Sequence, residues 1–170
     1  NADFQFVSQH TWIKPWGISW HLGVDGISLF LVVLTGVLFP LVIAGVDPHH
    51  DHKRYLSCML MLEACVMGSF ISLDLFLFFV FFEIVLVPMY FLIGGWGYDN
   101  RVYAATKFFL FTMVGSAFML VGIIATAVLA KADNGLITFD LVKIAENADF
   151  AASTGRWLFF AFAVAFAVKV

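Results

Sequence analysis

Long apolar runs dominate this sequence and limit its possible folds more than any other feature. A helix that rises 1.5 Å per residue needs roughly 20 apolar residues to cross about 30 Å of hydrocarbon. The chain holds four stretches of about this length and a fifth that is still apolar at the last residue. We therefore predict transmembrane helices over residues 26–46, 55–72, 75–94, 103–130 and 157–170.

Composition excludes a water-soluble domain and a nucleic-acid-binding protein. Soluble domains are roughly 45–50% apolar and about 25% charged, whereas this chain is 62% hydrophobic and 12% charged. Its net charge is −3, and no basic cluster is present to neutralise phosphates. Backbone groups in lipid must be hydrogen-bonded within their own segment, so we expect an all-α, polytopic transmembrane helical bundle with four complete helices and a truncated fifth. We expect residues 1–170 to form one transmembrane region of a longer protein.

Polar residues between the apolar runs predict the turns. Residues 72–74 interrupt the second and third runs and predict a tight turn there, and residues 23–26 predict the turn into the first helix. The segment before that helix is rich in tryptophan, which suits the headgroup region. The acidic residues 131–156 predict a solvated connection with some local order.

Basic residues in the short loops predict the orientation. Lys53 and Arg54 lie in the loop at residues 47–54, and Arg101 lies in the loop at residues 95–102. Cytoplasmic loops of membrane proteins carry an excess of lysine and arginine. We therefore expect both loops in the cytoplasm and the two long polar segments outside.

Four ionisable residues within the predicted membrane helices are the candidate functional residues: Glu63, Glu83, Lys107 and Lys169. A charge near the bilayer centre costs about 2.5–3.5 kcal/mol on insertion scales, so each needs a partner or a function. Glu83 follows Asp74 by nine residues, which places it roughly 13 Å deep. Lys169 follows Trp157 by twelve residues, which places it roughly 18 Å deep, measured from the same side of the membrane as for Glu83. We expect Glu83 and Lys169 to meet near the midplane.

The other two candidates have less certain surroundings. Glu63 and Glu83 are equally far from Leu73, so an antiparallel helix pair brings both carboxyls to one depth. We expect them to share an aqueous pocket in which one carboxyl is protonated, because two like charges at low dielectric repel. Lys107 lies close to a helix end, where a lysine can extend to the headgroups.

Pro88 favours a functional role for Glu83. Proline has no N–H to donate to the carbonyl four residues earlier, so the Ile84 carbonyl is free beside the carboxylate. A free carbonyl at membrane depth attracts water or a cation. The alternative is that all four charges form structural salt bridges between helices.

No metal or cofactor site is expected in this chain. Residues 48–52 contain the residue types of a zinc site, but adjacent histidines in a short loop usually remain solvated. Cys58 and Cys65 are seven residues apart on one predicted helix, roughly 10 Å and too far for a disulfide, and two thiolates cannot hold an iron–sulfur cluster. Helix glycines predict close helix contacts, at Gly68, Gly94, Gly95, Gly97, Gly115 and Gly122.

Several motifs resemble a known family. They are Trp16-Gly17-Ile18-Ser19, the run from His21 to Leu29, Leu73-Asp74-Leu75-Phe76-Leu77-Phe78, Phe82-Glu83, the run from Val87 to Ile93, Ala105-Thr106-Lys107-Phe108-Phe109 and Ala165-Phe166-Ala167-Val168-Lys169. Together they are similar to subunit M, or chain 4, of bacterial respiratory complex I and to its relatives among multisubunit sodium/proton antiporters.

The resemblance implies a fold, a function and partners. The fold is the fourteen-helix antiporter-like fold, of which this chain is a fragment. The function is proton translocation within a complex I type NADH:quinone oxidoreductase, in which Glu83 resembles the essential helix carboxylate and Lys169 the lysine of a broken helix. Lys107 matches a further lysine, and Glu63 is a fourth candidate. Flavin, iron–sulfur clusters and quinone are then expected in partner subunits, and this chain contacts other membrane subunits of the complex and the lipid of a bacterial inner (plasma) membrane.

Electrostatics is strong enough for this role. Two unit charges about 4 Å apart interact by about 4 kcal/mol at an effective dielectric of 20, whereas moving one charge against 100 mV needs about 2.3 kcal/mol. Two other functions remain open. One is the membrane subunit of a multisubunit cation/proton antiporter, and the other is a membrane scaffold whose charges only join helices.

Overall fold

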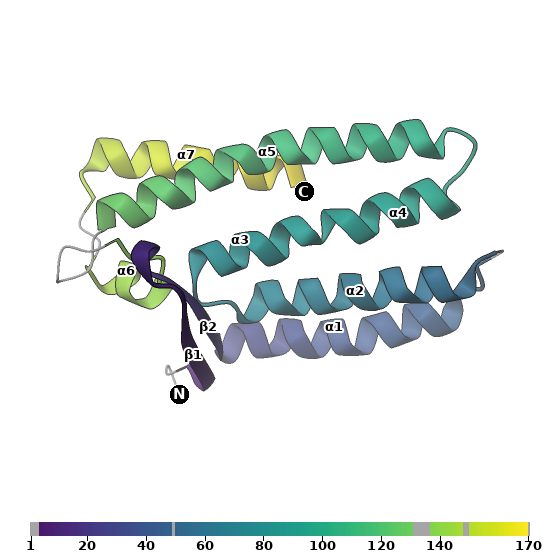
Figure 1. Cartoon of the computed structure of the whole chain (residues 1–170), viewed down its shortest axis with the longest axis horizontal. Coiled ribbons are helices and arrows are strands. Elements are labelled where there is room, and N and C mark those ends of the chain that lie inside the picture. The colour runs from purple at the N-terminus through teal and green to yellow at the C-terminus, as the bar shows by residue number, and fades with distance from the viewer. Residues whose placement is uncertain (1–3, 49, 131–136, 148–149, 170) are drawn as a thin grey trace.

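The computed structural model describes residues 4–48, 50–130, 137–147 and 150–169. Four helices in it have the length and apolar character needed to cross a membrane, over Gly26–Gly45, His52–Ile71, Leu75–Trp96 and Arg101–Ala130. They lie side by side as long rods (Figure 1). The fifth predicted helix is also present, so the helical transmembrane architecture is confirmed.

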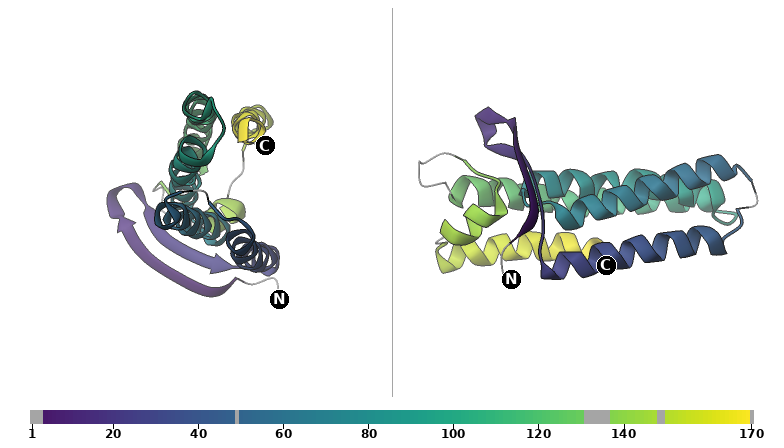
Figure 2. Two further views of the ribbon diagram at one scale, coloured as in Figure 1. Left: turned by 90° about the vertical axis from the view of Figure 1, so that its right-hand side faces the viewer. Right: turned by 90° about the horizontal axis from the view of Figure 1, so that it is seen from below.

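A β-hairpin precedes the first helix, which the sequence analysis did not foresee. Strand β1 (Gln5–Ile13) pairs antiparallel with β2 (Ile18–Val24) through a short 3-10 turn, η1 (Lys14–Trp16). Gly17 ends that turn with a φ of +67°, and a side chain there would collide with the backbone of Ile137. The end-on view shows the hairpin curving around the outside of the helices (Figure 2).

Helix α1 (Gly26–Gly45) begins at the predicted turn and pairs with α2 (His52–Ile71). Asp25 caps α1, because its carboxylate accepts a 2.7 Å hydrogen bond from the Ser28 amide while the Ser28 hydroxyl accepts a 2.9 Å bond from the Asp25 amide. Hydrogen bonds from Ser28 lower the pKa of Asp25 below its ordinary value. The cap is therefore ionised at neutral pH.

Helices α3 (Leu75–Ile84) and α4 (Leu86–Trp96) form one membrane span with a break at Val85. The predicted turn at residues 72–74 is confirmed. Asp74 is nearly fully buried and caps α3, accepting from the amides of Phe76 at 3.0 Å and Leu77 at 3.2 Å. Its second carboxylate oxygen accepts from the amide and the hydroxyl of Ser19 on β2, which ties the hairpin to the start of α3.

Helix α5 (Arg101–Ala130) is followed by a short helix α6 (Leu141–Asn147) and then by α7 (Ala152–Lys169). The α6 helix confirms local order between the last two membrane helices. Helix α7 packs along α5, where Gly115 lies against Val168 and Gly122 against Ala161 and Phe162. A Cβ at Gly115 would come within 2.6 Å of the Val168 side chain. These glycines therefore allow the close helix contact that the sequence predicted.

We call the end of the molecule that carries the hairpin and α6 the hairpin end. The opposite end, where α1 is joined to α2 and α4 to α5, is the loop end (Figure 1). The segment before α6 is bonded to the α2–α3 turn, with Leu75 N donating to Phe139 O at 2.8 Å and Leu141 N to Leu73 O at 2.9 Å. The buried core also lies toward this end, formed by Ile18, Met119, Ile123, Ala127, Phe139 and Ala165. The hairpin end is therefore closed by packing.

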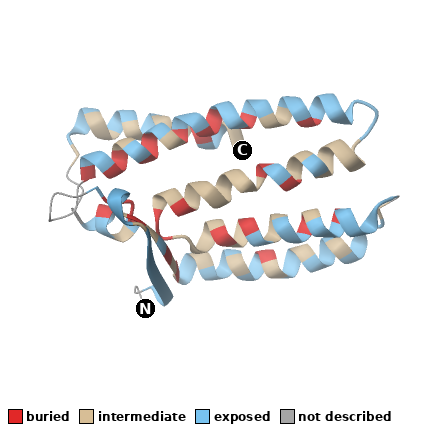
Figure 3. Ribbon diagram, in the orientation of Figure 1, coloured by how far each residue is buried: buried red, intermediate tan, exposed pale blue. Residues whose placement is uncertain are grey.

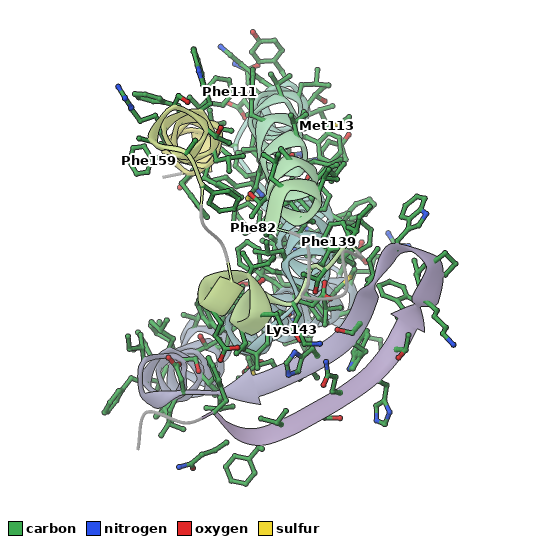
Figure 4. All side chains as sticks on the ribbon, turned by 90° about the vertical axis from the view of Figure 1, so that its left-hand side faces the viewer. Phe82, Phe111, Met113, Phe139, Lys143 and Phe159 are labelled. Atoms are coloured by element: carbon green, nitrogen blue, oxygen red, sulfur yellow. The ribbon has the colours of Figure 1, made fainter. Side chains whose placement is uncertain are left out.

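Apolar side chains also cover the outer surface. Exposed residues run along α1 and along the outward side of α5 (Figure 3). Phe111, Met113 and Phe159 are exposed and project outward from α5 and α7 (Figure 4). Such a surface fits lipid or further helices, not water.

Candidate functional site

Glu83 and Lys169 form an ion pair across the bundle. Lys169 Nζ lies 3.4 Å from Glu83 Oε1, and the two side chains are only 14% and 23% exposed in that order. Glu83 lies in the last turn of α3, and Lys169 lies at the end of α7. The end of α7 lies part of the way along the long helix α5 (Figure 1). The predicted meeting of these two charges is therefore present.

Phe82 supplies two more contacts to the Lys169 ammonium. Its carbonyl accepts from Nζ at 3.2 Å, and its ring centroid lies 3.8 Å from Nζ. An ammonium over an aromatic face gains roughly 0.5–2 kcal/mol. The ring is held by stacking on Phe78 and by an edge contact with Phe166, and it lies between α5 and α7 (Figure 4). Lys169 is thus held by a carboxylate, a carbonyl and an aromatic face.

Ser116 on α5 is a third member of the site, and the sequence analysis missed it. Its hydroxyl lies 2.9 Å from Glu83 Oε2 and is almost fully buried. Each carboxylate oxygen of Glu83 therefore has its own partner. The signal available in the sequence was a line of small and hydroxyl residues at helical spacing along α5: Thr112, Gly115, Ser116, Gly122 and Thr126.

The break in the span lies directly beside the ion pair. The α3 helix ends at Ile84, one residue after Glu83, and Pro88 follows in the first turn of α4. Because Pro88 has no N–H, it cannot donate to the Ile84 carbonyl. The span is interrupted at Val85, directly after this carbonyl.

The other two candidate residues do not join this site. Glu63 lies on α2 and is half-buried, and within the described residues its side chain has no hydrogen bond or ion pair. A pocket shared by Glu63 and Glu83 thus remains a prediction. Lys107 is exposed near the start of α5, with Nζ 5.8 Å from the centroid of the Tyr103 ring.

The histidine-rich turn before α2 makes aromatic contacts. His50 stacks on Trp96 with ring centroids 5.5 Å apart, and the Trp96 indole donates to the His50 carbonyl at 2.9 Å. His49 lies outside the described residues. Within the described ranges no three His, Cys, Asp or Glu residues gather to hold a metal, and Cys58 and Cys65 are free thiols.

A cavity of about 600 Å³ opens at the loop end between α2, α4 and α5. Tyr90, one of its lining residues, follows Glu83 by seven residues, or roughly 10 Å along the helix. The rim is polar and the wall apolar. Lining residues include His50, Asp51, Lys53, Arg54, Phe91 and Trp96. The cavity therefore ends roughly 10 Å from Glu83 on the loop-end side, and the buried core lies toward the hairpin end.

Comparisons with known proteins agree with these features. Residues 72–170 match the family model described as "NADH:quinone oxidoreductase/Mrp antiporter, TM". Over 173 residues the chain is 41% identical to NADH-quinone oxidoreductase subunit M of Rickettsia bellii, a match that covers 100% of this chain and 34% of that protein. It is 42% identical over 182 residues to subunit M of Rhodobacter capsulatus, with the same two coverages.

A solved structure is similar along nearly the whole chain. A chain of respiratory complex I from Thermus thermophilus with bound NADH superimposes with a TM-score of 0.80 at 31% identity, over 96% of this chain and 33% of that one. The membrane-bound sulfane sulfur reductase, an archaeal respiratory membrane complex, superimposes with a TM-score of 0.71 at 23% identity and supports the fold alone. The chain spans about a third of the length of these relatives.

Proposed function

Because the chain belongs to the NADH:quinone oxidoreductase/Mrp antiporter transmembrane family, we propose that it is part of a proton-translocating membrane subunit of a complex I type NADH:quinone oxidoreductase. The observation that supports this most is the 3.4 Å contact between Glu83 and Lys169 in the membrane interior. We take residues 1–170 as one transmembrane region of that subunit.

The ion pair is strong enough to control one proton. At 3.4 Å the two charges interact by about 5 kcal/mol at an effective dielectric of 20. Moving one charge against 100 mV needs about 2.3 kcal/mol. Separating Lys169 from Glu83 removes the support for the ammonium form, so the lysine releases its proton when a conformational change breaks the contact. Re-forming the contact loads the lysine again.

The surrounding structure sets the direction of access. Water can approach from the cavity at the loop end, which stops roughly two helical turns short of Glu83. The loop end carries Lys53, Arg54 and Arg101, so we propose that it faces the cytoplasm of a bacterial cell and that protons enter there. Packing around Ile18 and Phe139 blocks direct escape at the hairpin end.

Electron transfer is assigned to other subunits. We propose that flavin, iron–sulfur clusters and quinone are bound by partners and that none is bound by this chain. The exposed apolar faces of α1 and α5 then meet lipid, the rest of the subunit and neighbouring membrane subunits. Energy from electron transfer reaches Glu83 and Lys169 as a conformational change.

A cation/proton antiporter subunit is the second candidate, because the family model covers both kinds of protein. An experiment on the complete protein in its native membrane distinguishes these two candidate functions. Inverted vesicles from the source cells are given NADH, and proton uptake and quinone reduction are measured together. We expect both, with stoichiometric coupling, and loss of uptake in Glu83→Gln. Sodium-driven proton movement without NADH-dependent quinone reduction would support the antiporter instead.

A further inference from the structure

The Ser116 hydroxyl has two acceptors and only one proton to give. Its oxygen lies 2.9 Å from Glu83 Oε2 and also 2.9 Å from the Met113 carbonyl one turn earlier on α5. A serine hydroxyl has one O–H donor, two acceptor lone pairs and free rotation about its C–O bond. It can therefore donate to only one of these two oxygens at a time.

The two acceptors define two states of the hydroxyl. When Glu83 is ionised, Ser116 donates to Oε2. When Oε2 carries a proton, Glu83 becomes the donor, the Ser116 oxygen accepts, and the hydroxyl hydrogen rotates toward the Met113 carbonyl. The hydroxyl exchanges one acceptor for the other, and only hydrogen positions change.

From this geometry we propose that Ser116 is a positioning residue that pairs with Glu83 in both of its protonation states. The proposal rests on the function proposed above for the Glu83–Lys169 pair. When Lys169 leaves Glu83 as proposed above, the carboxylate takes a proton from hydronium in adjoining water: an O–H bond of hydronium breaks, an O–H bond forms on Oε2, and a neutral acid and water result. Ser116 keeps the carboxyl hydrogen-bonded before and after that step, so the partly buried site changes charge without an unpaired polar atom.

Neighbouring hydroxyls on the same helix do not have this arrangement. The hydroxyl of Thr112 lies 2.8 Å from the Phe108 carbonyl and 3.1 Å from the Phe109 carbonyl, both in its own helix, and the hydroxyl of Thr126 donates to the carbonyl of Gly122. These are ordinary bonds of a helix hydroxyl to its own backbone. Of the three buried hydroxyls on α5, Ser116 alone is bonded across to another helix within the described residues.

Ser116 also fixes the orientation of the Glu83 carboxylate, so that one oxygen faces the lysine. With Oε2 held by the serine, Oε1 is left for Lys169 at 3.4 Å. Without the hydroxyl, the carboxyl can rotate and its ionised form loses a donor. Hydrogen bonds to charged groups are strong enough that this loss weakens the stabilisation of the ionised carboxylate by a factor of roughly 10 to 100.

The test uses the complete complex in reconstituted vesicles and measures NADH-driven proton uptake across the neutral pH range. In Ser116→Ala we expect proton uptake at neutral pH to fall roughly 10-fold or more and the pH profile to differ from wild type, because the ionised carboxylate loses a donor. Ser116→Thr, which keeps the hydroxyl, should retain the wild-type profile. The matched control is Thr126→Val, which removes a buried hydroxyl on the same helix that does not contact Glu83; its profile should be unchanged.

The outcomes separate this proposal from the proposed function. NADH oxidation with an artificial acceptor and a native gel report assembly for each variant. A wild-type profile in Ser116→Ala, or an equally altered profile in Ser116→Ala and Ser116→Thr, overturns the role of Ser116 while leaving Glu83 intact. If Ser116→Ala fails to assemble, Ser116→Thr decides alone, because loss of pumping in an assembled threonine variant contradicts the proposal. Wild-type pumping in Glu83→Gln refutes the proposed function instead.

Discussion

Replacing Asp74 by Ala is expected to destabilise the hairpin end. The carboxylate is 1% exposed and accepts four hydrogen bonds, from two amides at the start of α3 and from the amide and hydroxyl of Ser19. Loss of a helix N-cap costs roughly 0.5–2 kcal/mol. Leaving the two Ser19 donors without a partner adds about 1–3 kcal/mol.

The sum is a loss of roughly 1.5–5 kcal/mol in stability. The assay is the midpoint temperature of thermal disassembly of the detergent-solubilised complex, together with protease cleavage within residues 4–25. Asp99→Ala is the control, since Asp99 is exposed in the turn before α5. Asp74→Asn keeps one acceptor oxygen and should fall between the two. Equal midpoints for Asp74→Ala and Asp99→Ala would refute the proposed role of this cap.

Three further predictions concern packing, site membership and orientation. Gly115→Leu should push α7 away from α5 and abolish pumping through loss of the Glu83–Lys169 contact, whereas Gly155→Leu, at a position on α7 with no neighbour within 4 Å of an added Cβ, should pump normally. Normal pumping by an assembled Gly115→Leu complex would show that the close contact is dispensable. Glu63→Gln should lower the proton-to-NADH ratio less than Glu83→Gln does, because Glu83 alone of the two is bonded to Lys169; equal losses would restore the shared-pocket prediction. A cysteine introduced at His50 should resist a membrane-impermeant thiol reagent added to intact cells, and labelling from outside would reverse the orientation.

Much of the helical architecture could be predicted because it depends on local properties of the sequence. Run length and apolar composition located the membrane helices, and the capping residues Asp25 and Asp74 marked where two of them begin. The depth of Glu83 and of Lys169 followed from counting residues at a fixed helical rise. Their contact could be expected because both charges needed a partner at that depth.

The remaining features depend on contacts between distant segments. The hairpin was missed because β1 is exposed along nearly its whole length and therefore has no alternation of buried and exposed residues. Its position is set by bonds from Ser19 to Asp74 across 55 residues. Ser116 was missed because a serine on an apolar helix ordinarily bonds to its own backbone, and its bond to Glu83 joins residues 33 positions apart. Sequence symmetry placed Glu63 at the depth of Glu83, but depth does not determine which face of a helix a side chain occupies.

The most direct test of the central claim is proton translocation per NADH oxidised in vesicles that contain the complex with Glu83→Gln. Glutamine preserves side-chain volume and can still accept from Ser116, but it removes the charge that holds Lys169 at 3.4 Å. We predict a steep fall in translocation with normal assembly and normal NADH oxidation, and partial recovery in Glu83→Asp. Pumping at the wild-type ratio in Glu83→Gln, or loss of pumping only through failed assembly, would contradict the account and leave Glu83 as a structural partner of Lys169.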